Sequence, residues 1–226
     1  MTETNLQKLA LEIIADSKTE EEKIEKLYHY VKEKVKYKLT IIGDPEEILK
    51  LSYGSCIDNS LLFAELLKSI KIKSRYRVIL VDFNLVSRII FLAKVIPPFL
   101  RIPFYFHIFN EVYSQGEWKK FDTSFDSEIE KYFLGKKFAS GETECCVPKK
   151  YISKDLGSFN NLSDVFAEPF FSQLVNQLLS FKEIAQFGIN LFNWFLYIKR
   201  KNKTKGLKVK ETIENILRNI EKLKKY

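Results

Sequence analysis

The segment Tyr53–Ser60, which reads Tyr-Gly-Ser-Cys-Ile-Asp-Asn-Ser, constrains this chain more than any other part of it. A glycine turn leads directly into Cys56, and Cys56 opens a run of apolar residues with helical spacing. Ser55 is suited to cap this helix, and Asp58 lies in the first turn, where a carboxylate suits the helix dipole. A helix N-terminus can lower the pKa of a thiol, and the thiolate is the nucleophilic form. Cys56 is therefore a candidate nucleophile, and an unreactive buried cysteine is the alternative that this segment leaves open.

The composition is that of a globular chain, expected in a reducing compartment. The chain has 226 residues, of which 46% are hydrophobic, so it can bury a substantial core. Its three cysteines, two of them adjacent (Cys145 and Cys146), do not make a disulfide framework. The first residues lack the pattern of a signal peptide, and no stretch reaches the roughly 18 apolar residues of a membrane span. We therefore expect a cytoplasmic protein.

Three helices are expected before Cys56. Residues 5–16 have apolar residues at helical spacing, and a second helix follows Thr19 and Glu20 to Glu22, which form a capping-box pattern, and runs to about Lys36. His29 is on this helix but off its apolar stripe, so we expect it to be exposed or half-exposed. Asp44 followed by Pro45 is the start signal of a third, short helix that leads to Gly54.

Strands are expected after the Cys56 helix. Residues 75–83 are rich in β-formers, and residues 106–113 and 118–122 form a hairpin around Gln115-Gly116. Between them, residues 84–104 are apolar, contain two adjacent prolines and carry only basic charges, which indicates an insertion such as a lid. A helix is expected over residues 127–138.

The composition changes near Lys150, and the predicted division is a core over residues 1–150, including the insert 84–104, and a helical region over 151–226. Residues 165–198 have a long apolar stripe at helical spacing, and the opposite stripe is mostly uncharged. A basic connector, Lys199 to Lys205, follows, and the last helix has an apolar seam at residues 209–223. Such stripes predict packing against the core or against a second copy.

The predicted hairpin brings His107 and Asp122 together. A two-residue loop at Gln115-Gly116 pairs residue 109 with 122 and residue 107 with 124, so His107 and Asp122 are diagonal neighbours on one face, about 7–8 Å apart at the backbone. A register shifted by one pair places them directly opposite. Either way the carboxylate can hold one imidazole nitrogen and leave the other for a thiol. The alternative is that His107 is an ordinary sheet histidine whose hydrogen bonds are satisfied and that Asp122 is only a strand-end residue.

Three motifs in this order resemble the transglutaminase-like superfamily, over roughly residues 20–125. They are Gly54-x-Cys56-x-Asp58 opening a helix, His107-Ile-Phe-x-Glu111-Val-Tyr on a strand, and Trp118-x-x-x-Asp122-Thr123 on the next strand. The resemblance implies an α+β, papain-like fold in which helices pack on an antiparallel sheet. It also implies a triad carried by Cys56, His107 and Asp122. Phe109 stands where the family usually has tryptophan, and the insert 84–104 is longer and more apolar than the usual connection.

The remaining features predict no cofactor and no metal. Cys145-Cys146 lacks CxxC spacing, and only one histidine besides His107 is present, so a zinc site is not expected and both cysteines should be dispensable. The basic run 199–210 lacks an aromatic stacking platform, and no nucleic-acid partner is expected. The segments 84–104 and 187–205 are candidates for peripheral contact with a membrane, and the C-terminal helices are candidates for a homo-oligomer contact.

The favoured function is cysteine-dependent acyl transfer on a peptide or protein substrate, above all hydrolysis of a peptide or amide bond through a thioester on Cys56. His107 is the expected base and then acid, Asp122 its orienter, and the backbone N–H of Cys56 one oxyanion donor. The resembled superfamily includes proteases, cross-linking transglutaminases, peptide:N-glycanases and inactive members, and an intact triad argues only against the last. The competing interpretation is a non-catalytic module that binds a protein partner or a membrane surface through the apolar insert and the C-terminal helices.

Overall fold

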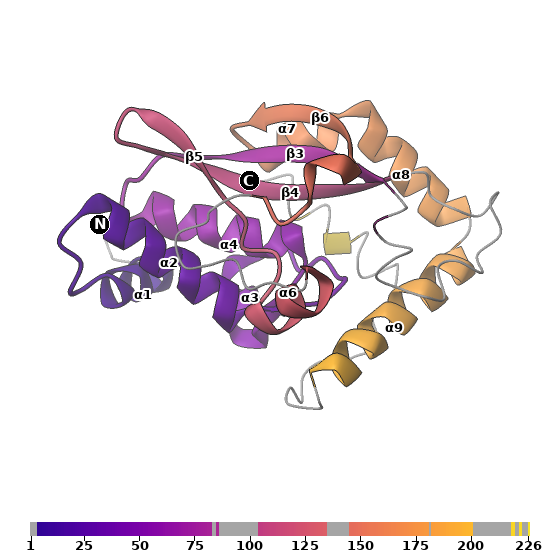
Figure 1. Cartoon of the computed structure of the whole chain (residues 1–226), viewed down its shortest axis with the longest axis horizontal. Helices are drawn as coiled ribbons and strands as arrows, with labels where there is room; N and C mark the ends of the chain where they lie inside the picture. The colour runs from indigo at the N-terminus through magenta and orange to yellow at the C-terminus, as the bar shows by residue number, and fades with distance from the viewer. Residues whose placement is uncertain are drawn as a thin grey trace.

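Among the residues that the structure describes, a four-stranded antiparallel sheet is covered on one side by N-terminal helices (Figure 1). The computed structural model describes residues 4–82, 85, 104–134, 145–180, 182–200, 218–219, 222 and 226. Its helices are α1 (Asn5–Ile13), α2 (Glu20–Lys34), α3 (Pro45–Leu51), α4 (Cys56–Ser69), α6 (Ser127–Leu134), α7 (Leu162–Ala167), α8 (Pro169–Ser180) and α9 (Lys182–Lys199), with a 3₁₀ turn at Lys149–Tyr151. Its strands are β1 (Lys36–Tyr37), β2 (Tyr53–Gly54), β3 (Ser74–Asp82), β4 (Phe104–Ser114), β5 (Glu117–Phe121) and β6 (Ile152–Phe159). This mixture confirms the expected α+β fold.

Local capping signals set the starts of the N-terminal helices. Thr19 and Glu22 form the capping box of α2, as expected. Asp44 accepts hydrogen bonds from the backbone N–H groups of Glu46 and Glu47 at 3.1 Å each, and Pro45 occupies the first turn of α3. Helix α2 ends at Lys34, two residues before the expected end, because the chain there leaves the helix to form β1, which pairs with β2.

The sheet has the strand order β5-β4-β3-β6. Helix α4 packs against β4 and β3, and the main core lies between them and α1 to α3, with Leu61, Leu66 and Ile108 fully buried. Gln115 and Gly116 both have positive φ values, 55° and 86°, as a two-residue type I′ hairpin turn requires. This turn pairs Ser114 with Glu117 and so selects the first of the two registers considered for the hairpin.

The region expected to be helical after residue 150 begins with a strand. β6 pairs antiparallel with β3 at the sheet edge, from Tyr76 opposite Phe159 to Val81 opposite Ile152. Its sequence, Ile-Ser-Lys-Asp-Leu-Gly-Ser-Phe, is poor in β-formers and irregular in register, and Gly157 has a φ value of 95°. Tertiary pairing rather than local propensity therefore makes this segment a strand, and the division at residue 150 stays a prediction.

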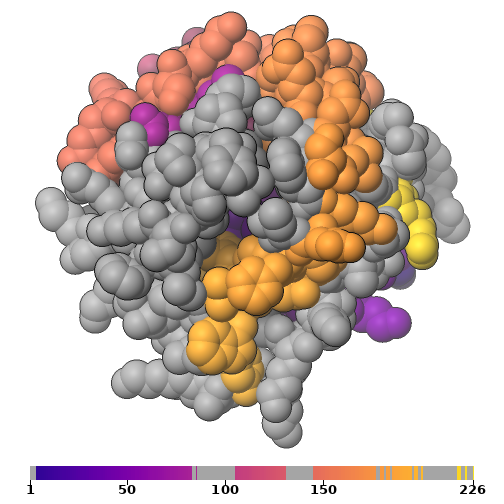
Figure 2. Space-filling view, turned by 90° about the vertical axis from the view of Figure 1, so that its right-hand side faces the viewer, coloured from indigo at the N-terminus to yellow at the C-terminus, as the bar shows by residue number. Residues whose placement is uncertain are grey.

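The long apolar run over residues 165–198 is divided among α7, α8 and α9. Glu168, which precedes Pro169, has an extended backbone and separates α7 from α8. Asn193 on α9 accepts from the N–H of Leu39 at 2.8 Å and donates to the carbonyl of Leu39 at 3.1 Å, which ties this helix to the core. Figure 2 shows α8 and α9 on the molecular surface (orange). No helix in the described part of the chain is long and apolar enough to cross a membrane. The insert 84–104, except Leu85 and Phe104, and most of the expected last helix lie outside the described residues.

Candidate active site

The start of α4 places Cys56 at the first position of a capped helix. Ser55 is its N-cap, and Asp58 accepts from both the backbone N–H and the hydroxyl of Ser55, at 2.9 and 3.0 Å. A Cβ added to Gly54 would lie 2.6 Å from the Cβ of Asp58, so only glycine fits before this cap. The glycine and the acid of the sequence motif are therefore needed for the close turn that presents Cys56, which is buried with 8% of its surface exposed.

Asp58 also fixes the loop before α3. Its second carboxylate oxygen accepts from the backbone N–H groups of Ile42 and Gly43 at 2.8 and 3.0 Å. Complete burial raises the pKa of Asp58, although its hydrogen bonds from Ser55, Gly43 and Ile42 oppose that rise. The contacts of Asp58 are thus those of a structural residue that holds the loop and the helix start together.

The β4–β5 hairpin brings His107 and Asp122 into direct contact. The Nε2 atom of His107 donates to Oδ2 of Asp122 at 2.7 Å, and the two side chains are buried, at 7% and 1% exposure for the residues. Asp122 also accepts from the backbone N–H of Ser124 at 3.0 Å and of Cys146 at 2.9 Å. The contact leaves Nδ1 of His107 for another partner, as the sequence-based reasoning required.

Charge is stabilised on both members of this pair. Burial favours the neutral form of each, but the charge of Asp122 raises the pKa of His107 well above its usual value. In turn, His107 and the hydrogen bonds from Ser124 and Cys146 hold the pKa of Asp122 below its usual value, against the effect of burial. The pair therefore favours the charged form of both members, an imidazolium beside a carboxylate.

Polar side chains on the buried face of α4 connect the Cys56 helix to the strands of this pair. Asn59 donates to the carbonyl oxygens of Thr123 and Ser124 at 2.9 and 3.3 Å. The hydroxyl of Ser60 donates to the carbonyl of Ile108 at 3.2 Å, and Asn110 donates to the carbonyl of Ser60 at 3.2 Å. The sequence analysis did not place these residues in the site. The only sign of them in the sequence is that polar residues interrupt an apolar run.

Tyr37 is a further residue that the sequence analysis did not place in the site. β1 pairs with β2 so that Tyr37 lies opposite Gly54, and its ring packs edge-on against Phe125 at 4.8 Å between centroids. Burial raises the pKa of its phenol, and Cys56 adds to the rise, whereas His107 lowers it. Tyr37 is thus an electrostatic neighbour of both Cys56 and His107. Among the described residues, no hydrogen bond joins Cys56 directly to His107.

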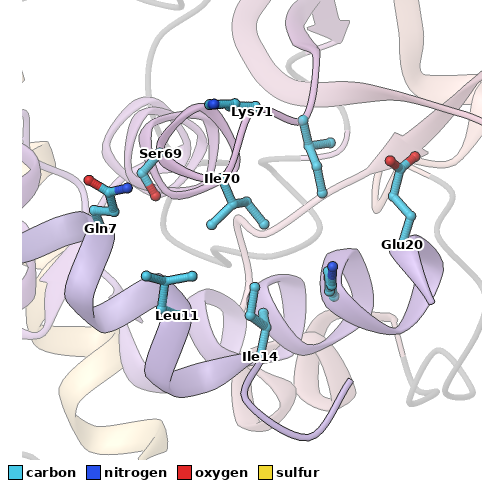
Figure 3. Close-up of a pocket in the computed structure, with 9 residues that line it drawn as sticks. Gln7, Leu11, Ile14, Glu20, Ser69, Ile70 and Lys71 are labelled. Atoms are coloured by element: carbon cyan, nitrogen blue, oxygen red, sulfur yellow. The ribbon is translucent and has the colours of Figure 1, made fainter. Parts of the chain in front are cut away.

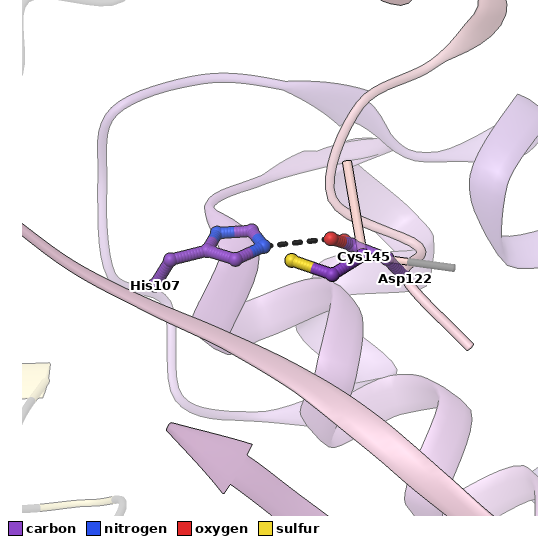
Figure 4. A group of neighbouring side chains, drawn as sticks. All are labelled: His107, Asp122 and Cys145. Atoms are coloured by element: carbon purple, nitrogen blue, oxygen red, sulfur yellow. Dashed lines mark hydrogen bonds and ion pairs between the residues drawn. The ribbon is translucent and has the colours of Figure 1, made fainter. Parts of the chain in front are cut away.

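Cys145 and Cys146, which the sequence analysis expects to be dispensable, lie next to His107. The sulfur of Cys146 is 3.6 Å from Nε2 of His107. The sulfur of Cys145 lies within 4.8 Å of ligand atoms of His107 and Asp122, and Figure 4 shows it beside the hydrogen bond of that pair. Burial, followed by the charge of Asp122, raises the pKa of Cys146 well above its usual value. Its thiol is therefore held in the protonated, weakly nucleophilic form.

The sequence model of the transglutaminase-like superfamily matches residues 7–123, which is more than half of the chain. The chain belongs to the transglutaminase-like superfamily. The matched span contains Cys56, His107 and Asp122, and it ends before Cys145 and Cys146. Membership therefore supports, at the level of the family, a cysteine-dependent enzyme.

Two further comparisons add little to this transglutaminase-like assignment. Among solved structures, the chain is similar to a provisionally named cysteine protease from Cytophaga hutchinsonii, with 19% identity and a TM-score of 0.43. The similarity covers 70% of this chain and 43% of that one, so this chain spans less than half of that protein's length. No curated protein sequence matches the chain.

Two surface pockets of this transglutaminase-like protein lie away from the His107–Asp122 pair. One, of about 300 Å³, lies between α1, the start of α2 and the end of α4, and Figure 3 shows Leu11, Ile14 and Ile70 around it. The other, of about 420 Å³, borders α1 and α3. His29, on the outer face of α2, is exposed as expected.

Proposed function

We propose that this protein is a cysteine-dependent acyl-transfer enzyme that hydrolyses a peptide or amide bond of a peptide or protein substrate. The observation that carries the proposal is the buried His107–Asp122 hydrogen bond of 2.7 Å, formed beside the helix that begins at Cys56. A base held by a carboxylate, next to a thiol at a helix N-terminus, is the arrangement that nucleophilic catalysis needs. Cytoplasmic location remains part of this proposal.

In the proposed mechanism, Nδ1 of His107 carries the proton of the Cys56 thiol, so that Cys56 and His107 form a thiolate–imidazolium pair, and the thiolate sulfur forms a bond to the substrate carbonyl carbon. Asp122 holds Nε2–H and stabilises the imidazolium that results. The backbone N–H of Cys56 donates to the oxyanion, and the imidazolium gives its proton to the leaving amine as the C–N bond breaks. Water, deprotonated by His107, then attacks the thioester and releases Cys56. An amine in place of water would give transfer instead of hydrolysis.

Cys56 rather than Cys146 is proposed as the nucleophile, although Cys146 contacts His107. Burial and the charge of Asp122 keep the thiol of Cys146 in the protonated form, and the backbone N–H of Cys146 donates to Asp122. Cys56 instead opens a 14-residue helix, where backbone N–H groups stabilise a thiolate.

An electrophilic peptide-like probe with peptide mapping tests this proposal. We expect labelling of Cys56 well below pH 8, its loss in Cys56→Ala and His107→Ala, and no change in Cys145→Ser/Cys146→Ser. His29→Ala is the matched control, because this histidine is exposed on α2. Labelling of Cys146 in place of Cys56, or loss of labelling in His29→Ala with His107→Ala unaffected, would contradict the proposal.

A non-catalytic binding role is the second candidate, and the outer face of α9 favours it. Phe187 and Trp194, two helical turns apart, are 68% and 59% exposed. Such a face suits a protein partner, a second copy of the chain or a membrane surface. Flotation with anionic and neutral vesicles, and sedimentation of the Phe187→Ser/Trp194→Ser variant beside the wild type, would test it. A monomer that binds neither type of vesicle would leave only a protein partner for this role.

A further inference from the structure

We propose that His107, Asp122 and Cys145 form a site for a soft divalent cation, with Zn²⁺ as the preferred ion, and that this cation switches off the thiol chemistry proposed above. One ligand atom from each residue lies within 4.8 Å of the other two (Figure 4). Imidazole nitrogen, carboxylate oxygen and thiolate sulfur are together the ligand set that zinc prefers. The regulatory part rests on the proposed function, whereas the binding of the metal does not.

The separations suit a tetrahedral ion after small movements. Zinc–ligand bonds of about 2.0 to 2.3 Å place ligand atoms of one tetrahedral site about 3.3 to 3.8 Å apart. The sulfur of Cys146 is 3.6 Å from Nε2 of His107 but is not among the three ligand atoms that lie within 4.8 Å of one another, so the fourth position is left to a water molecule. Nε2 of His107 and Oδ2 of Asp122, at 2.7 Å, are too close for two zinc ligands. The ion must therefore break their hydrogen bond and separate the two atoms.

Groups around the three ligands already hold them in place. Asp122 keeps hydrogen bonds from the N–H groups of Ser124 and Cys146, and the N–H of Val147 donates to the sulfur of Cys145 at 3.4 Å. Such outer contacts orient carboxylate and thiolate ligands in metal sites. Cys145 is half-buried, whereas His107 and Asp122 are buried, so Cys145 is the most accessible of the three ligands.

Metal binding at Nε2 removes the base that Cys56 needs. The ion replaces the Nε2 proton of the imidazolium and the proton of the Cys145 thiol, and both protons pass to the buffer. The remaining imidazole proton is on Nδ1, so this nitrogen cannot accept the proton of Cys56. Asp122, now bound to the metal, no longer orients the ring for catalysis.

The test is a metal titration of the full-length protein, first freed of metal under reducing conditions. Zn²⁺ is titrated against a chromophoric chelator, and Co²⁺ is added separately, because a sulfur-to-cobalt charge-transfer band reports a thiolate ligand. We expect one ion per chain, and an affinity at least tenfold lower in Cys145→Ser. The controls Cys56→Ala and His29→Ala should bind within about twofold of the wild type. Circular dichroism checks that each variant is folded.

The same samples are then labelled with the electrophilic probe. Zn²⁺ should slow the labelling of Cys56 at least tenfold in the wild type, and much less in Cys145→Ser at the same free Zn²⁺. A Zn²⁺ affinity of Cys145→Ser equal to that of the wild type would overturn the proposed site. A loss of Zn²⁺ affinity in Cys56→Ala as large as that in Cys145→Ser would overturn it as well. Tight binding without slower labelling would overturn the regulation. If Cys56 does not react even without metal, the proposed function fails, while the titration still decides the metal site.

Discussion

The side-chain amide of Asn59 donates to the carbonyl oxygen of Thr123 at 2.9 Å, and so joins the helix of the proposed nucleophile to the residue that follows Asp122. Asn59 is one turn after Cys56, is fully buried, and donates to Ser124 as well. The spacing between the helix start and the His107–Asp122 pair therefore depends on a side chain that takes no part in the chemistry.

Asn59→Ala should cost about 1–3 kcal/mol in the free energy of unfolding, because it leaves two buried carbonyl oxygens without a partner. It should also slow probe labelling of Cys56 by about tenfold or more, since misplaced catalytic groups lose rate steeply. Urea unfolding and labelling rates measure the two effects. Asn5→Ala is the control, because Asn5 is exposed and its side-chain amide donates to the carboxylate of Glu46, and its effect should stay within about 0.5 kcal/mol. Unchanged labelling in Asn59→Ala would mean that this link does not position the site.

Substitutions of the proposed triad should differ in severity. Cys56→Ala and His107→Ala should abolish turnover, whereas Asp122→Ala should lower kcat by about 10²- to 10⁴-fold, because nucleophile and base both remain. Asp122→Asn should retain more, since an amide oxygen can still accept from Nε2 of His107. Steady-state kinetics on a substrate found by profiling measures the order. Equal activity in Asp122→Asn and Asp122→Ala would show that the carboxylate acts by its charge alone.

Tyr28 should make the protein less stable in alkali. Burial raises the pKa of Tyr28 to about 12, and its ring packs against Phe63 and Phe121. Its usual pKa is about 10, so between about pH 10 and 12 the unfolded chain releases the phenol proton and the folded chain keeps it. This contribution to stability is complete below about pH 10 and is lost as the pH rises to about 12.

Over that range the wild type should lose up to about 2–3 kcal/mol more unfolding free energy than Tyr28→Phe, which keeps the ring without the phenol proton. Urea unfolding at several pH values measures the two slopes. Equal slopes would mean that Tyr28 ionises in the folded protein as easily as in the unfolded chain.

Arg200 and Asp126 form a buried ion pair that the sequence does not reveal, because Arg200 belongs to a segment whose sequence indicates only a basic connector. Both are almost completely buried, and Asp126 also accepts from the N–H of Tyr37 at 3.1 Å. Arg200→Ala should cost about 3–5 kcal/mol, since the N–H of Tyr37 and the Nζ of Lys36, at 3.8 Å, compensate only part of the buried charge of Asp126. Adding Asp126→Asn should recover part of this loss. Thermal unfolding measures both, with the exposed Arg218→Ala as control.

The sequence predicted those features whose signals are local. Asp44 and Ser55 mark helix starts, and Gln115-Gly116 fixes the hairpin register, so the contact of His107 with Asp122 followed from the turn. The position of Cys146 beside His107 depends on a contact between residues 39 positions apart, for which no local pattern exists. β6 was missed for the same reason, because its pairing with β3 overrides a sequence that is poor in β-formers.

Gly54 offers the sharpest test of why the motif before Cys56 contains glycine. A Cβ there would lie 2.6 Å from the Cβ of Asp58 and 3.1 Å from Oδ1 of Asn59, so Gly54→Ala must displace the start of α4. We expect a loss of about 1–3 kcal/mol in unfolding free energy and at least tenfold slower labelling of Cys56.

Gly188→Ala is the matched control, because nothing lies within 4 Å of a Cβ added at that position of α9. Alanine in an open helical position should stabilise the protein by about 0.5–1 kcal/mol and leave labelling unchanged. If Gly54→Ala labelled as fast as wild type, the close turn would not be what presents Cys56 to its substrate.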